Sequence, residues 1–158
     1  MKLEGAQKIA AEVIKRLSPY CEKIEVAGSI RRRKSIVHDI DLVLIPFDPW
    51  NLESEVLALA HPLKPKMSGE KLKRLDYCGA QIDLYYASPE TWSTLLLIRT
   101  GSKENNIRLC RRAKDLGRHL AANGDGLFDG TGKRIAGDTE ISIYNALGLP
   151  YQPPWERK

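Results

Sequence analysis

Residues 28–43 have the sequence GSIRRRKSIVHDIDLV, and this stretch decides the fold. It joins a glycine-serine turn and four consecutive cations to Asp39 and Asp41, which open an apolar run that ends at Pro46. In a strand, successive side chains point to opposite faces, so the two aspartates share one face about 7 Å apart. Two carboxylates at this spacing can chelate a hard cation. The basic turn beside them can bind an anion, and the bound cation can contact the same anion. This combination is typical of a phosphoryl-transfer site.

A simpler interpretation of the same stretch stays open. Alternating acids on a strand often form only its solvated face, and a run of cations often forms a solvated loop. The combination of turn, cations and acids within one short segment favours the functional interpretation.

A third acid is expected further along the chain. Residues 72–87 predict two strands around a tight turn at residues 78–79. In the second strand, Ile82 and Leu84 point to the side opposite Asp83. An acid at the centre of such a strand is costly unless something pairs with it. We therefore interpret Asp83 as the third carboxylate, the alternative being an aspartate on the exposed face of a sheet.

A basic helix is expected in the second half of the chain. From residue 103 to 118 there are six cations against two acids, and a helical wheel places the arginines opposite Leu109 and Ala113. Such a face can hold a nucleic-acid backbone, or it can simply be solvated.

The order glycine-serine, arginine-arginine, then Asp-x-Asp entering an apolar strand resembles the nucleotidyltransferase superfamily. More closely, it resembles the family X DNA polymerases, the group of DNA polymerase beta. The segments at 100–109, 126–128 and 147–154 are similar to the carboxy-terminal part of bacterial family X polymerases. Each motif alone is modest, but the ordered set spans nearly the whole chain.

The resemblance implies a role for each matching residue. The catalytic and metal-binding carboxylates are Asp39, Asp41 and Asp83, holding two Mg²⁺ ions, with Mn²⁺ as the alternative ion. The nucleotide-binding residues are Gly28, Ser29, Arg32, His38, Arg99, Gly101, Ser102 and Asn106. The DNA-binding residues are Lys103, Arg108, Arg111 and Arg112.

The expected fold is of the α+β class. A nucleotidyltransferase palm with a mixed sheet covers residues 1–87, and a small thumb-like lobe covers residues 88–158. Helices are expected at 3–17, 52–60, 103–118 and 141–147, and another is expected to begin with Ser88 as its N-cap.

Composition is consistent with this assignment. The 158 residues are 42% hydrophobic and 28% charged, which is ordinary for a globular protein, and the net charge of +5 allows a polyanionic partner. No apolar run reaches the length of a membrane span. The three cysteines have no zinc-site spacing, and a reduced cytoplasmic setting with a monomeric chain is expected.

Three departures from the family pattern stand out. The family's amino-terminal lyase domain and helix-hairpin-helix elements have no counterpart here, so no 5′-phosphate or abasic-site chemistry is expected. The aromatic pair that precedes Thr-Gly-Ser in relatives is replaced by Ile98-Arg99, which affects sugar selection. Cys110 stands where many members carry an arginine that probes the template strand, which affects fidelity.

The expected activity is DNA-directed DNA synthesis on a primer 3′-hydroxyl, in gap filling or repair. The expected partners are primer-template or gapped DNA, nucleoside triphosphates and a DNA ligase, with no membrane. Two alternatives stay open: a template-independent nucleotidyltransferase that acts on DNA or RNA ends or on a small substrate, and a catalytically silent module that binds nucleic acid.

Overall fold

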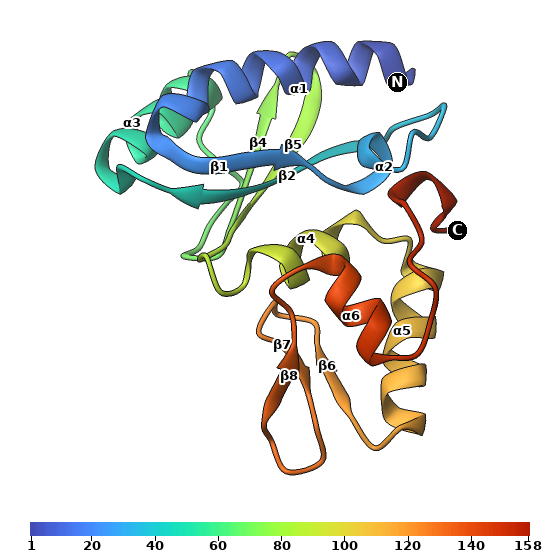
Figure 1. Ribbon diagram of the computed structural model, residues 1–158. Coiled ribbons are helices and arrows are strands. Elements are labelled where there is room, and N and C mark those ends of the chain that lie inside the picture. Colours follow the sequence, from blue (N-terminus) through green and yellow to red (C-terminus); the bar gives the residue numbers. More distant parts are fainter.

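Two β-sheets organise the chain in the computed structural model, which describes residues 1–158 (Figure 1). The larger sheet has the strand order β1-β2-β5-β4-β3, and the smaller one has the order β6-β7-β8. The strands are β1 (Cys21–Val26), β2 (Asp39–Pro46), β3 (Met67–Ser68), β4 (Leu72–Tyr77), β5 (Ala80–Tyr86), β6 (His119–Ala121), β7 (Gly126–Phe128) and β8 (Arg134–Ala136). The helices are α1 (Leu3–Leu17), α2 (Gly28–Arg31), α3 (Pro49–Ala60), α4 (Trp92–Thr100), α5 (Lys103–Asp115) and α6 (Glu140–Ala146), with short 3₁₀ turns η1 (Ser18–Tyr20) and η2 (Pro154–Glu156).

The larger sheet is mixed. Strands β2 and β5 pair in parallel at its centre, while β1, β4 and β3 add antiparallel neighbours. A parallel pair requires a crossover connection, and here the chain between β2 and β5 supplies α3 and the outer strands β3 and β4. The α+β class with a mixed sheet is confirmed.

Side-chain alternation gives the large sheet two different faces. On one face Ile40, Leu42 and Leu84 are fully buried beneath α1 and α3. Burial of each such side chain contributes about 1.5–3 kcal/mol. On the other face Val43 and Tyr85 pack with Trp92 of α4. The acids of β2 and β5 lie on this second face, because they alternate with the residues of the first core.

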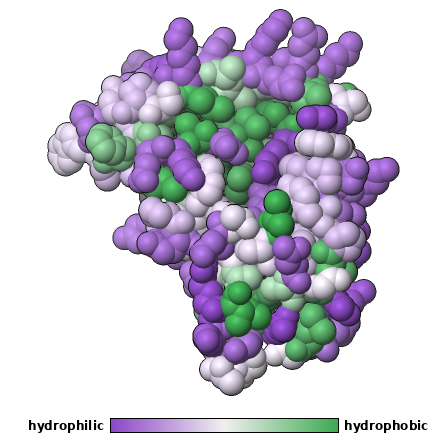
Figure 2. Space-filling model, in the orientation of Figure 1, coloured by the Kyte–Doolittle hydropathy of each residue, from purple (hydrophilic) through white to green (hydrophobic).

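Polar side chains lie along the outer edge of the large-sheet lobe over α1, and apolar side chains gather below it (Figure 2). No helix of the chain combines the length and the apolar character needed to cross a membrane.

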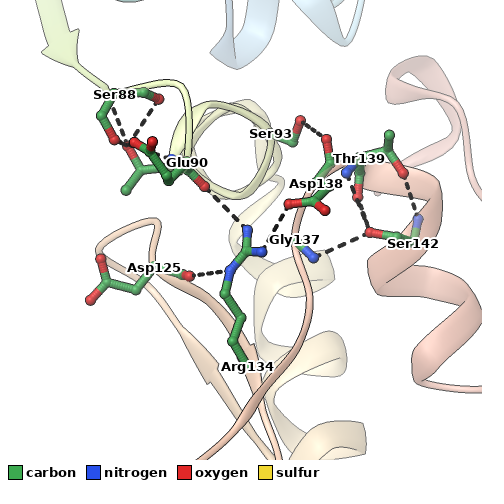
Figure 3. A network of polar contacts seen from close by, with 10 residues as sticks. Ser88, Glu90, Ser93, Asp125, Arg134, Gly137, Asp138, Thr139 and Ser142 are labelled. Carbon is green, nitrogen blue, oxygen red and sulfur yellow. Dashed lines mark hydrogen bonds and ion pairs between the residues drawn. The ribbon is translucent and has the colours of Figure 1, made fainter.

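The smaller sheet and helices α4, α5 and α6 enclose a separate core that includes Leu97, Leu109 and Leu127. Arg134 of β8 ties this sheet to the start of α4 (Figure 3). Its guanidinium donates to the carbonyls of Asp125 and Glu90 and pairs with Asp138 at 2.8 Å.

The chain end returns to the large-sheet lobe, where it lies beside α2 (Figure 1). Glu140 of α6 accepts hydrogen bonds from Arg31 of α2 at 2.7 Å and from the fully buried Arg157 at 2.5 Å. The Arg33 guanidinium also stacks over the Trp155 ring at 3.8 Å. These contacts connect the two lobes, and the boundary at residues 87–88 stays a prediction.

Two helix starts differ from expectation. Helix α3 begins at Pro49, because the Asp48 carboxylate caps it by accepting from the Asn51 amide. Helix α4 begins only at Trp92, so Ser88 as its N-cap was wrong. Ser88 instead hydrogen-bonds with Thr91, and the two residues close a local turn before the helix (Figure 3).

Candidate active site

The three aspartates come together at the centre of the large sheet. Asp41 and Asp83 are register partners on the parallel strands β2 and β5, and Asp39 lies opposite Gln81. Register partners point to the same side of a sheet, so all three carboxylates lie on the face that α4 covers. Asp39 is exposed, Asp41 is half-buried and Asp83 is buried.

Asp83 is held by a two-point ion pair. The Arg74 Nε donates to Oδ1 at 2.8 Å and Nη2 donates to Oδ2 at 3.3 Å. Gln81 adds a longer contact to Oδ1 at 3.4 Å. Because Asp83 is only 4% exposed, this pairing compensates for the loss of hydration of its carboxylate.

Asp41 lies against the glycine-serine turn. A Cβ at Gly28 would come within 2.1 Å of the Asp41 Oδ2, and Gly28 has a positive φ of 55°. Only glycine allows this close approach. Burial, together with the negative charges of Asp83 and Asp39, raises the pKa of Asp41 to about 7, although Arg99 and Arg32 act to lower it. At Asp41, burial and two neighbouring acids therefore outweigh the effect of the nearby cations.

The basic turn presents one arginine with a free donor. Helix α2 starts at Gly28, and the Arg32 Nη1 donates to the Thr100 carbonyl across the lobes. The Arg32 Nε is buried without a partner. Burial lowers the pKa of Arg32, while Asp41 and Glu104 raise it. A half-buried guanidinium with a buried, unused N–H is suited to an anionic oxygen.

The junction of α4 and α5 forms the opposite wall. Arg99 is exposed and stacks over the Tyr85 ring at 4.3 Å. The Ser102 hydroxyl caps α5 by accepting from the Asn105 amide. Asn106 donates to the Ile98 carbonyl at 2.8 Å, and its Oδ1 is buried without a partner.

The cations of α5 have different surroundings. Lys103 is exposed at the first position of the helix. Arg108 donates to Asn105 and to the Lys158 carbonyl, and Arg112 donates to the Leu147 carbonyl. Arg111 is exposed, with no hydrogen bond or ion pair to the protein. Arg108, Arg111 and Arg112 line one cavity of the carboxy-terminal lobe, whereas Lys103 lies outside it, and the DNA-binding role expected for the four stays a prediction.

Two comparisons with known proteins bear on this geometry. Residues 95–158 match the family model described as DNA polymerase beta thumb. The chain is also 28% identical, over 155 aligned residues, to the DNA polymerase/3′-5′ exonuclease PolX of Bacillus subtilis (strain 168). These two similarities support a family X polymerase-like protein. The alignment covers 94% of the chain and spans only 27% of the length of this relative.

The donor set suits a hard cation, because three carboxylates share one face of the sheet. As the side chains lie, however, no three His, Cys, Asp or Glu residues form a ready-made metal site. Arg74 already occupies both oxygens of Asp83. His38 is exposed directly before Asp39, and the roles expected for it and for the other site residues stay predictions.

Two residues beside the carboxylates, Arg74 and Tyr85, were not expected from the sequence. Arg74 lies opposite Asp83 in the hairpin of β4 and β5. Counting back from the two-residue turn at Cys78-Gly79 would have found this pairing. Tyr85 lies two positions after Asp83 and therefore on the same face, but its stacking with Arg99 depends on how α4 lies across the sheet.

Proposed function

We propose that this protein is a DNA polymerase of the family X type that adds nucleotides to a primer 3′-hydroxyl in gap filling or repair. The observation that carries the proposal is the pairing of Asp41 with Asp83 on adjacent parallel strands, directly against the Gly28 turn. Carboxylates beside a phosphate-sized basic turn serve nucleotidyl transfer, whereas a purely DNA-binding surface gains nothing from grouped acids.

In this proposal the primer 3′-oxygen attacks the α-phosphorus of the triphosphate, the bond to the bridging oxygen breaks and pyrophosphate leaves. The proton of the 3′-hydroxyl passes to Asp83 or to water. Gly28, Ser29 and Arg32 hold triphosphate oxygens, with the unused Nε of Arg32 as one donor. Asn106 faces the base, and Gly101 and Ser102 lie against the sugar.

Asp39 and Asp41 would hold two Mg²⁺ ions, and Asp83 would complete the one nearer the primer. Such ions, when bound, stabilise both the attacking and the leaving oxygen. For this, Asp83 has to release at least one oxygen from Arg74. Arg74 is partly exposed, with 32% of its side-chain surface accessible, so its guanidinium can turn to solvent or to a DNA phosphate.

Primer extension tests the proposal. Each nucleotide is offered singly with Mg²⁺, once on a one-nucleotide gap and once on a single-stranded end. Incorporation of only the complementary nucleotide, and only on the gapped substrate, is the expected result. Untemplated addition to the single-stranded end would favour the template-independent alternative, and no addition with any nucleotide would contradict polymerase activity.

A further inference from the structure

Helix α3 exposes a side that carries no charged residue. Its exposed residues are Pro49, Trp50, Asn51, Ser54, Leu57 and Ala58. The exposed side of an amphipathic helix ordinarily carries charges, and that of α1 has an acid or a base in every turn. Of the two long helices of the large-sheet lobe, only α3 therefore has an uncharged outer side.

The two acids of α3 do not reach this outer side. On one flank of the helix, Glu53 forms an ion pair with Lys73 of β4 at 2.8 Å. On the other flank, Glu55 forms an ion pair with Arg16 of α1 at 2.7 Å. Both carboxylates are thus bound to neighbouring elements of their own chain, and neither is available to a partner on the outer side.

Large apolar side chains are exposed on this side. Trp50 is 84% exposed and Leu57 is 48% exposed, and Phe47, just before the helix cap, is 75% exposed. At about 100° per residue, Trp50, Leu57, Ser54 and Ala58 lie within about 100° of arc and form one stripe along the helix. Single apolar residues are common on protein surfaces, whereas a contiguous group of them marks an interaction site. We refer to the stripe together with Phe47 as the α3 patch.

The α3 patch lies away from the carboxylates. Helix α3 covers the face of the large sheet that buries Ile40 and Leu42, whereas Asp41 and Asp83 lie on the opposite face. The helix is also at the end of this lobe away from α2 and the chain end (Figure 1). Apolar and neutral side chains project at this end of the lobe (Figure 2). A partner bound to the α3 patch therefore leaves the carboxylate site open.

The stripe is complementary to a second copy of itself. In an antiparallel pair of α3 helices that cross at Ser54, Trp50 of one copy lies over Ala58 of the other, because the two residues are four positions before and four positions after the crossing. Leu57 lies opposite Asn51 in the same arrangement. Large side chains against small ones allow packed helices to interdigitate, and a two-fold interface repeats each contact.

The two ends of the helix also favour an antiparallel pair. Asp48 precedes the helix and Lys64 follows it, and neither forms an ion pair. Antiparallel packing brings the start of one helix toward the end of the other, so the acid of one copy lies on the side of the cation of its partner. The partial charges of the helix ends are opposed in the same way.

We propose that the α3 patch is the interface of a homodimer, in which two copies of this chain pack antiparallel about Ser54. At about 150–250 Å² per ring, Trp50 and Phe47 offer about 240–400 Å² in each copy. Two copies with Leu57 and Ala58 added then bury about 1,000 Å², the size at which an interface becomes specific. A partner with a charged surface finds no counter-charge on this side. The proposal is independent of the proposed activity, and it differs from the monomer expected from the sequence.

Sedimentation equilibrium of the chain tests the proposal. An interface of this size suits reversible association with a Kd of about 1–100 µM. As the concentration rises through this range, the wild type is expected to shift from the chain mass of 17.8 kDa toward twice that mass. L57E places a charge in the interface and should weaken association about tenfold or more. The matched control is I107E on α5, where the native side chain is 46% exposed, and it should associate like the wild type. A wild type that stays monomeric throughout the range, or an L57E variant that dimerises equally well, would overturn the proposal.

The variant A58W separates specific pairing from non-specific adhesion. Ala58 is exposed, so a larger side chain leaves the fold of one copy intact. In the proposed pair the new ring collides with Trp50 of the other copy, and association should weaken although the patch has become more apolar. Stronger association of A58W than of the wild type would contradict the proposed packing.

Disulfide cross-linking tests the crossing point. S54C and N51C are each made in a C78S background, which removes the exposed native thiol, and are oxidised with diamide. Only residues at the crossing point of two packed helices bring their Cα atoms within the reach of a disulfide. S54C should give a covalent dimer and N51C little or none. Equal cross-linking of the two variants would rule out the pairing about Ser54.

Discussion

At the scale of single residues, the charges of the carboxylate site converge on Asp41. Its neighbours on the sheet are acids, its contact with the turn is a glycine, and the nearest cations are Arg32 and Arg99. Asp83, by contrast, has its own arginine. The two register partners therefore differ: Asp83 forms an ion pair with Arg74, whereas Asp41 forms no ion pair.

This difference predicts a pH dependence of stability. The pKa of Asp41 is about 7 in the folded protein against an ordinary 3.8, so between these values the folded state binds the proton and the unfolded state releases it. Stability should therefore fall as pH rises from about 4 to 7. In EDTA, D41N should remove this part of the Tm dependence. A Tm profile in D41N that parallels the wild type would show that Asp41 titrates normally.

At the scale of elements, α4 supplies Arg99 and β5 supplies the Tyr85 ring on the wall where we propose that the sugar lies. Relatives carry aromatic residues at the end of the helix before Thr-Gly-Ser, whereas here Arg99 occupies that place and stacks on Tyr85. The Arg99 guanidinium also lowers the pKa of Asp41, so its charge acts on the carboxylates. A ring that would crowd a ribose 2′-hydroxyl is therefore absent from this end of α4.

If the proposed activity is present, we accordingly expect this protein to accept ribonucleotides more readily than relatives that keep the aromatic pair. Loss of a clash worth ~2.7 kcal/mol would relax discrimination about a hundredfold. R99F should partly restore deoxynucleotide preference, and R99K, which keeps the charge without a ring, should not. The measurement is the ratio of kcat/KM for the two nucleotides on one gapped substrate. A strong deoxynucleotide preference that R99F leaves unchanged would refute this expectation.

Much of the element scale was accessible from the sequence. Strand alternation predicted the shared face of Asp39 and Asp41, and α1 has the bounds that its periodicity indicated. The parallel register of Asp41 with Asp83 was not accessible, because it depends on the crossover connection of residues 47–79 between β2 and β5. The start of α4 was missed because Ser88 bonds Thr91 instead of capping a helix.

At the scale of the whole molecule, one acid connects the lobes. The Glu140 carboxylate accepts hydrogen bonds from Arg31 of α2 and from Arg157 near the chain end. These contacts span 109 and 17 residues of sequence. Arg31 also donates to Thr100, the last residue of α4. No local pattern predicts such contacts, because they exist only once both lobes are folded.

Removal of this acid should destabilise the fold. E140Q leaves the fully buried Arg157 without a counter-charge, and the loss of one partner from a buried pair costs about 3–5 kcal/mol. The matched control is D138N, which breaks the ion pair between Asp138 and Arg134. Because the Asp138 side chain is 87% exposed, this substitution should lower the free energy of unfolding by less than about 1 kcal/mol. Urea unfolding of both variants is the measurement. Equal, small losses would mean that Glu140 does not join the lobes.

In the proposed function, Asp83 carries out nucleotidyl transfer together with Asp39 and Asp41 on the adjacent strand. The most direct test of this role is single-nucleotide extension of a gapped primer with Mg²⁺ by the wild type and by D83N. The comparison requires that D83N is folded, which a Tm equal to that of the wild type would show. Substitution by asparagine keeps the volume of the side chain but removes the charge that a metal and the attacking oxygen require. Extension by the wild type with none detectable for D83N is the predicted result. Near-normal extension by D83N would contradict the claim.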